Sequence, residues 1–208
     1  MRSCAPLIAA AALLGLAAPN YCHASDGIPR LERQGSAVRL IVDGRPFLAL
    51  AGELGNNTAT SLENVQPIWP RLVEANLNCV LVALSWAQLE PEEGKFDFEL
   101  VDGLIEAARR HNLKLIFLWF GSWKNGLSSY APYWVKRDFE RFPRIRLRNG
   151  DSLELLSPFS DATRDADARA FRALMRHLRE IDGRQHTVLM MQVENEVGTR
   201  TEWFIIHT

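Results

Sequence analysis

The sequence has few cysteines and no recognisable metal-binding spacing, and both absences exclude classes of protein. Only three cysteines occur in 208 residues, and Cys4 and Cys22 fall within residues 1–24, so the chain has no disulfide framework. The five histidines form no HExxH motif and pair with no cysteine at ligand spacing. We therefore predict no metal, and a buried, inert thiol at Cys79, which lies in an apolar run.

A strong charge of either sign is also missing. The formal net charge is −1, and lysine and arginine are spread along the chain, so no nucleic acid partner is predicted. The one basic stretch, 136–148, is interrupted by acidic residues and is typical of a solvated loop face. With 47% hydrophobic and 24% charged residues, the composition is that of an ordinary globular protein.

Residues 1–24 have the pattern of a secretory signal peptide. A positive Arg2 precedes an apolar run over 7–18, and Cys22-His23-Ala24 provides a small-x-small cleavage site. The run is about a dozen residues long, whereas a membrane span needs roughly 20. We expect the mature chain to begin near Ser25, to be periplasmic or secreted, and to have no membrane attachment after cleavage.

The remaining sequence alternates short apolar runs with amphipathic segments. Asp43-Gly44 between two apolar runs predicts a hairpin, so 25–46 is assigned to an N-terminal β hairpin ahead of a domain over 47–208. Buried strands are predicted over 47–51, 78–86, 113–120 and 187–193. Helices, in which apolar residues recur at spacings of three and four, are predicted over 68–75, 98–111 and 166–181.

This alternation predicts an α/β fold with a parallel sheet. A doubly wound sheet and a (β/α)8 TIM barrel both fit, but no GxGxxG or P-loop motif follows a predicted strand, so a nucleotide cofactor is not expected and the barrel is favoured. The long insertion over 121–164 lies where barrels carry active-site loops. Only about four strand-helix units are present, whereas a barrel needs eight and about 250 residues. We expect a truncated or frame-shifted product, or a fragment.

Acidic side chains follow several predicted strands, where barrel enzymes place catalytic groups. Glu53 and Glu90 end the first and second strands, and the fourth ends in Glu194-Asn195-Glu196. Taken alone, an Asn-Glu pair is more often part of a solvated loop. The second strand, however, continues into a specific string of residues, which is Trp86, Glu90-Pro91, Gly94, Phe96 and Phe98.

With these motifs the chain resembles the clan A glycoside hydrolases over roughly 39–198, most closely the family 35 β-galactosidases, with family 42 as the neighbouring possibility. That family ends its fourth strand in Gln-Val-Glu-Asn-Glu, an aromatic residue and Gly, matched here by 192–196 and Gly198. The resemblance implies a retaining glycosidase of terminal β-galactosides, with a carbohydrate substrate. It implies that Glu196 is the acid/base, that Asn195 binds the sugar 2-hydroxyl, and that Glu194 supports the site.

The chain departs from family 35 at several positions. Val197 and Ala83 replace tyrosines, and Trp119 to Asn125 replace an Ala-Glu-Trp sequence after the third strand. These departures indicate a divergent subgroup and leave open the sugar, the linkage and the oligomeric state. A clan A endo-glycanase and a noncatalytic, vestigial sugar-binding fragment are the alternatives.

Aromatic side chains near the strand ends could stack on sugar rings, although many aromatic residues simply pack in the core. Among them we predict Trp86 and Trp123 as substrate-binding residues, together with Glu53 as a polar subsite wall. Glu90 is predicted to order its loop. In this clan the nucleophile comes from the seventh strand, which would lie beyond Thr208, so the resemblance implies that the 208-residue chain is inactive by itself.

Overall fold

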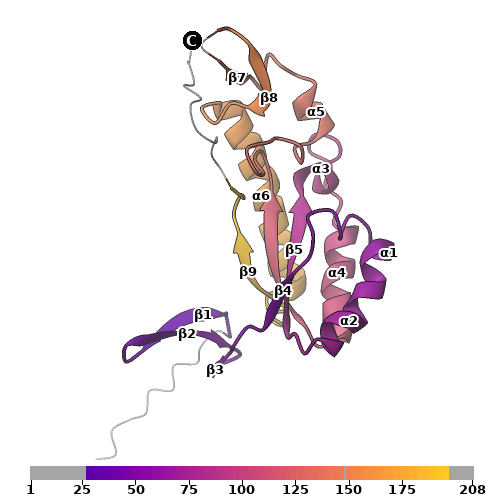
Figure 1. Cartoon of the computed structure of the whole chain (residues 1–208), viewed down its shortest axis with the longest axis vertical. Helices are drawn as coiled ribbons and strands as arrows, with labels where there is room; N and C mark the ends of the chain where they lie inside the picture. Colours follow the sequence, from indigo (N-terminus) through magenta and orange to yellow (C-terminus); the bar gives the residue numbers. More distant parts are fainter. Residues whose placement is uncertain (1–26, 148, 197–208) are drawn as a thin grey trace, which may run out of the picture.

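The computed structural model describes residues 27–147 and 149–196, and its centre is a four-stranded parallel sheet (Figure 1). The strands pair in the order of the sequence, which is β4 (Ala51–Glu53), β5 (Cys79–Ser85), β6 (Lys114–Phe120) and β9 (Val188–Gln192). Doubly wound sheets reverse their strand order at a switch point, and none of these four strands does so. The α/β class with a parallel sheet is confirmed. The described strands form an open sheet, not a closed barrel.

Helices cover one face of this sheet. The two long ones, α4 (Glu99–Arg110) and α6 (Asp161–Asp182), share the main hydrophobic core with β5 and β6. Ser160 caps α6 by accepting a hydrogen bond from the Thr163 backbone N–H, so the helix begins before the predicted residue 166. Three short elements lie beside α4 in Figure 1, namely α1 (Leu62–Val65), η1 (Gln66–Ile68) and α2 (Trp69–Glu74).

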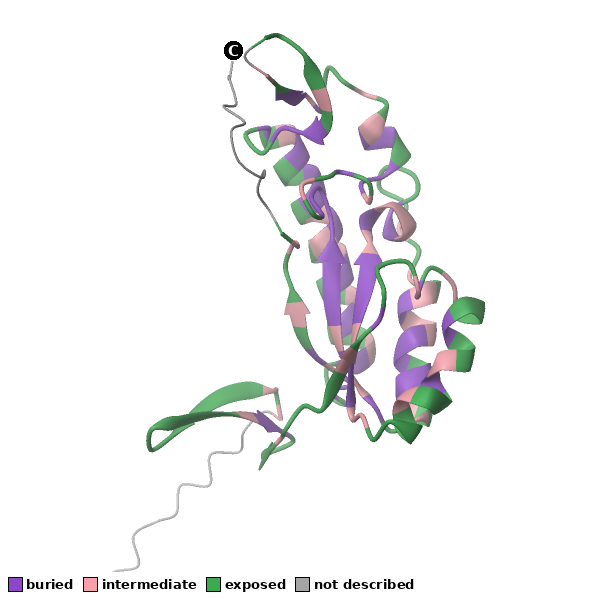
Figure 2. Cartoon of the chain, viewed as in Figure 1, coloured by how far each residue is buried: buried purple, intermediate pink, exposed green. Residues whose placement is uncertain are grey.

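The two central strands are buried on both faces. Alternate residues such as Val82 and Phe117 pack against the helices. Their neighbours Ala83, Leu118 and Phe120 form a separate cluster on the opposite face. Figure 2 shows β5 and β6 almost wholly buried, whereas β9 has exposed and half-buried residues. Continuous apolar runs in the sequence therefore mark the central strands correctly.

The first strand of the sheet begins later than predicted. The sequence predicts a strand over 47–51, but only Ala51–Glu53 pairs with β5. Just before it, the side-chain amide of Asn78 donates to the Leu48 carbonyl and accepts from the Leu50 N–H. The Leu48 carbonyl and the Leu50 N–H thus bind a side chain and not a paired strand, so this run is not a strand, and Leu48 and Leu50 are exposed.

A small antiparallel sheet precedes the main one, formed by β1 (Arg30–Gln34), β2 (Ala37–Val42) and β3 (Arg45–Pro46). The hairpin expected at Asp43-Gly44 joins β2 to β3, and both residues have positive φ, of 50° and 76°, as a two-residue turn requires. Most of this sheet is exposed (Figure 2). The signal peptide expected over 1–24 lies outside the described residues and stays a prediction.

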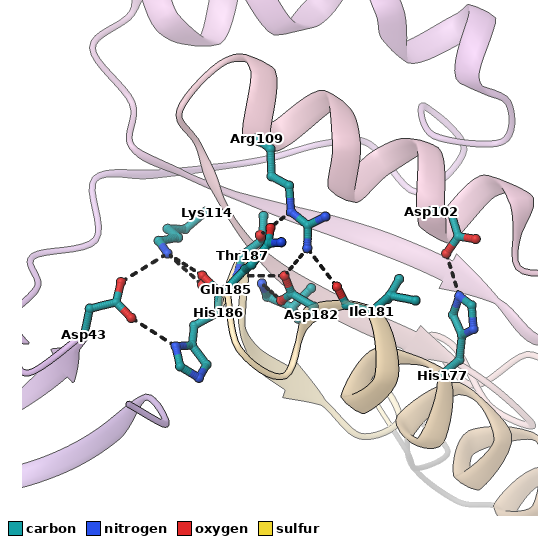
Figure 3. Close-up of polar contacts among 11 residues, drawn as sticks. Asp43, Asp102, Arg109, Lys114, His177, Ile181, Asp182, Gln185, His186 and Thr187 are labelled. Carbon is teal, nitrogen blue, oxygen red and sulfur yellow. Dashed lines mark hydrogen bonds and ion pairs between the residues drawn. The ribbon is translucent and has the colours of Figure 1, made fainter. Parts of the chain in front are cut away.

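An ion pair joins α4 to the last residue of α6 (Figure 3). Asp182 is 4% exposed, and its carboxylate lies 2.7 Å from Nη2 of Arg109. It also accepts hydrogen bonds from the backbone N–H groups of Thr187 and Val188, at 3.1 and 2.7 Å. The carboxylate is thus compensated by a cation and by two amide dipoles.

The small sheet is attached to the same end of the main sheet (Figure 3). Asp43 lies 3.0 Å from Nδ1 of His186 and 3.7 Å from Nζ of Lys114, which itself donates to the His186 carbonyl. The hydrogen bond with His186 lowers the pKa of the Asp43 carboxyl below its ordinary value, and Lys114 lowers it further.

The segment between β6 and α6 carries secondary structure of its own beyond the carboxyl end of the sheet (Figure 1). It contains the helix α5 (Tyr133–Lys136) and a hairpin of β7 (Arg144–Arg146) and β8 (Ser152–Leu156). These elements are too short for hydrophobic periodicity to reveal, so the sequence predicted a loop over the whole of 121–164.

Candidate active site

Two segments meet at the carboxyl end of the sheet, one after β6 and one after β9. Lys124 and Leu127 pair across a tight turn in which Asn125 and Gly126 have φ of 53° and 67°. Lys124 also forms a parallel β-bridge with Asn195. The pairing between β6 and β9 is thus resumed beyond the ends of both strands. The Asn125-Gly126 dipeptide is typical of such turns, but only a loop was predicted over 121–164.

Lys124 brings a cation to the predicted acid/base. Its Nζ lies 3.6 Å from Oε2 of Glu196, 2.5 Å from Oδ1 of Asn195 and 4.7 Å from the centroid of the Phe120 ring. Phe120 belongs to the face of the sheet opposite the helices, so the group gathers over that face. The side chain of Glu196 is 61% exposed there. We call Lys124, Asn195 and Glu196 the acid/base cluster; no motif in the sequence predicted a role for Lys124.

Glu194 has its partners on the helix side of the sheet, around Asp167 of α6. Asp167 is 6% exposed and accepts three hydrogen bonds, from Nε1 of Trp119 at 2.7 Å and from the N–H and hydroxyl of Ser122 at 2.6 and 2.5 Å. Oε2 of Glu194 accepts from the Trp123 N–H at 3.2 Å. Burial, followed by the hydrogen bond and the charge of Asp167, raises the pKa of Glu194 to about 9. We call Asp167 and Glu194 the carboxyl pair.

The backbone of the segment after β9 is strained. Glu194 and Glu196 have φ of 62° and 50°. Positive φ is uncommon for residues other than glycine, asparagine and aspartate, and it costs on the order of 1–3 kcal/mol. Such conformations concentrate at functional sites because the surrounding contacts hold them in place. The strain therefore supports a functional role for this segment.

Trp86 and Glu90 lie together in the core. Trp86 is fully buried and donates a hydrogen bond of 2.8 Å to Glu90, whose other oxygen accepts from the Gly94 N–H and from Arg169. The Trp134 ring packs edge-on against Trp86. Trp86 therefore packs in the core and has no exposed ring face on which a sugar could stack. Glu90 orders the loop that follows it.

The other two predicted substrate-binding residues lie on different segments. Trp123, whose backbone N–H binds Glu194 of the carboxyl pair, is 6% exposed and packs with Ile145 and Leu155. Glu53 is exposed at the end of β4, and β5 and β6 lie between β4 and β9, the strand that Glu196 follows. The structure thus brings Glu194, Asn195, Glu196 and Trp123 to one end of β6 and β9, without Glu53 or Trp86.

A cavity of about 590 Å³ lies beside the carboxyl pair, between α6 and the segments that follow β6, β8 and β9. Its volume is in the range of small-molecule sites, roughly 300–1,000 Å³. The wall includes Trp119, Trp123 and Phe171. It is on the helix side of the sheet, and the acid/base cluster is on the other.

Within residues 27–147 and 149–196, no group of three or more histidine, cysteine or acidic side chains is arranged to hold a metal ion. No helix in the same part of the chain has both the length and the hydrophobicity to cross a membrane. Cys79 is buried and has no disulfide partner among the described residues, and burial raises the pKa of its thiol.

Comparison with known proteins identifies the family to which the chain belongs. The profile of glycoside hydrolase family 42, described as β-galactosidase, matches residues 60–206. The β-galactosidase GalA of Bacillus licheniformis is 28% identical over 114 residues, which cover 55% of this chain and 16% of that relative. The β-amylase catalytic domain of Paenibacillus polymyxa superposes with a TM-score of 0.51 at 13% identity, covering 62% of this chain and 33% of that one.

These matches differ in what they establish. The β-amylase similarity shows the fold alone. The family profile covers most of the chain, including the motifs at 86–98 and 192–196. The profile is that of family 42, the neighbouring possibility in the motif resemblance, and membership of family 35 is not shown. The chain belongs to glycoside hydrolase family 42, the β-galactosidase family whose profile it matches.

Proposed function

We propose that this chain is the acid/base-bearing part of an exported, retaining β-galactosidase, with Glu196 as the acid/base. The observation that carries the proposal is the position of Glu196, which follows β9 at the carboxyl edge of a parallel sheet, beside Asn195 and open to solvent. Active sites of parallel α/β folds lie at this edge. The carboxyl group is accessible to a glycosidic oxygen there.

The mechanism assigns separate tasks to the acid/base cluster. Glu196 protonates the leaving oxygen and later deprotonates the water that releases the sugar. Lys124 holds Oδ1 of Asn195, so the amide NH2 of Asn195 is the part that remains for a sugar hydroxyl. A hydrogen bond to the 2-hydroxyl that strengthens in the transition state would contribute to catalysis.

The four parallel strands form a sector of a (β/α)8 barrel in this proposal. Their sequential order and their helices on one face are the features that support it. The face that carries Ala83, Leu118 and Phe120 would then line the barrel interior. Retention requires a second carboxylate about 5–5.5 Å from the first, and in the proposal it comes from a strand outside the described sheet. We therefore expect no turnover by the 208-residue chain alone.

The test is hydrolysis of aryl β-galactosides by the exported 208-residue chain and by any longer product of its reading frame. We expect activity only in a longer product. Glu196→Gln should there lower kcat about 10²- to 10⁴-fold. The loss should be smaller for a dinitrophenyl galactoside, because that leaving group needs little protonation. Glu180→Gln, an exposed carboxylate change on α6, is the matched control and should leave the rate unchanged.

Three outcomes would contradict parts of the proposal. Turnover by the 208-residue chain that Glu196→Gln abolishes would refute the missing carboxylate but support the acid/base. Equal losses with good and poor leaving groups would refute proton donation by Glu196. Hydrolysis of xylan or mannan without galactoside hydrolysis would replace the substrate with a polysaccharide.

A further inference from the structure

We propose that Asp167 and Glu194 share one proton and together act as a positioning device for the acid/base cluster, from the opposite side of the sheet. This inference rests on the proposed role of Glu196. Neither carboxyl lies on the sheet face that carries Glu196, so both are positioning residues and not catalytic ones. No sequence motif singled out Asp167.

Gly121 allows the carboxyl pair to form. A Cβ atom at this position would lie 2.5 Å from both Oε1 of Glu194 and Nε1 of Trp119, and closer still to Oδ2 of Asp167. The two carboxyl oxygens are therefore within about 5 Å of each other, the range in which like charges disfavour double ionisation. Any residue larger than glycine would force the polar atoms apart.

The surroundings favour one proton for two carboxyl groups. Asp167 already accepts three hydrogen bonds, and protonated Glu194 donates a further one to it. No basic side chain donates to either group among the described residues. Arg164, which also lines the cavity, pairs with Asp161 and Asp165, and the ammonium of Lys124 contacts Asn195 and Glu196. Like-charge repulsion is thus relieved by a proton.

The pair connects the two segments that build the acid/base cluster. Asp167 binds Ser122 and Glu194 binds the Trp123 N–H, directly before Lys124. Glu194 itself directly precedes Asn195. When the proton is present, the pair holds the two segments together and stabilises the positive φ of Glu194. When the proton leaves for solvent, repulsion separates the segments, and Lys124 loses its alignment with Asn195 and Glu196.

The experiment uses the 208-residue chain and needs no hydrolysis, so it can fail or succeed independently of the proposed function. Infrared spectroscopy of the carbonyl stretch of protonated carboxyl groups is followed from pH 5 to 10. We expect one protonated carboxyl to persist at pH 7 and to titrate in the alkaline range. Glu194→Gln should remove this signal, and Asp167→Asn should lower its midpoint by about one pH unit or more, since the like charge is gone. Glu180→Gln, which changes an exposed carboxylate, should leave it unchanged.

The positioning role has its own readout in the same titration. The backbone carbonyl-carbon resonances of Asn195 and Glu196, which do not exchange with solvent at alkaline pH, should move with the carboxyl midpoint in the wild-type chain, and should stay constant over this range in Glu194→Gln. Absence of a protonated carboxyl at pH 7 in the wild type would overturn the proposal. A carboxyl titration that those two resonances do not follow would overturn the positioning role. Both decisive measurements use the wild-type chain, so a variant that fails to fold does not prevent the test.

Discussion

The two ends of the parallel sheet use buried acidic side chains in opposite ways. At the amino end, Asp182 is paired with Arg109 and with two backbone N–H groups, so its charge is compensated. At the carboxyl end, Asp167 lies against a second carboxyl group, Glu194. The first arrangement stabilises the fold, whereas the second is electrostatically unfavourable unless a proton is bound. Barrel enzymes divide stability and function between the ends of their sheets in the same way.

The largest effect on the free energy of unfolding is expected at the amino end of the sheet. Asp182→Ala leaves Arg109 without its carboxylate partner and the N–H groups of Thr187 and Val188 without their acceptor. We expect a loss of about 3–5 kcal/mol in the free energy of unfolding, measured by urea denaturation. The control is Glu106→Ala, which breaks an exposed pair with Arg110 at 3.8 Å and should cost less than about 0.5 kcal/mol. Similar losses in both variants would contradict the assigned role of Asp182.

A smaller effect is expected from overpacking the carboxyl end. Gly121→Ala would drive a methyl group into the polar atoms of Trp119, Asp167 and Glu194, and we expect a loss of about 1–3 kcal/mol in unfolding free energy. Gly103→Ala on α4 is the matched control, because the three atoms nearest its Cβ would all belong to the movable Leu62 side chain, while alanine favours the helix. If Gly121→Ala is as stable as Gly103→Ala, the close approach of the carboxyl pair is wrong.

The smallest expected effect concerns the attachment of the small sheet. The lowered pKa of Asp43 means that its contribution to stability is present above the unfolded-state pKa, near 4, and is lost as the pH falls through the lower folded-state value. Because the Asp43 side chain is 58% exposed, solvent screening limits the contribution to less than about 1 kcal/mol. The protection of the β1 and β2 amides, taken relative to the intrinsic exchange rate at each pH, should therefore fall on acidification in the wild type but be insensitive to pH in Asp43→Asn. Identical pH dependence in both proteins would refute this.

The elements that the sequence predicted well are those with a long local signal. The runs over 113–120 and 98–111 gave β6 and α4 to within about two residues, because burial on both faces and a helical apolar stripe mark them directly. The run over 47–51 was misplaced because the side chain of Asn78, distant in sequence, binds its backbone. The open arrangement of the sheet also depends on pairing between distant strands.

The site was predictable in part for the same reason. Glu194, Asn195 and Glu196 follow an apolar run, so their place at the strand end was visible. Asp167 had a weaker signal of a functional role. It is a polar residue four positions before Phe171 on the apolar stripe of α6, and no role was predicted for it. Lys124 had no such signal, because its contact with Glu196 depends on the turn at Asn125-Gly126 and on the pairing of β6 with β9.

The sequence by itself determined the α/β class, the central strands and the acidic segment after β9, since these follow from local periodicity and from motifs contiguous in the chain. Only the tertiary structure decided which side of the sheet each acidic side chain faces. It buried Trp86, separated Glu53 from the site, placed Lys124 beside Glu196, and brought Asp167 against Glu194. Those outcomes depend on contacts between residues distant in sequence, which no local pattern encodes.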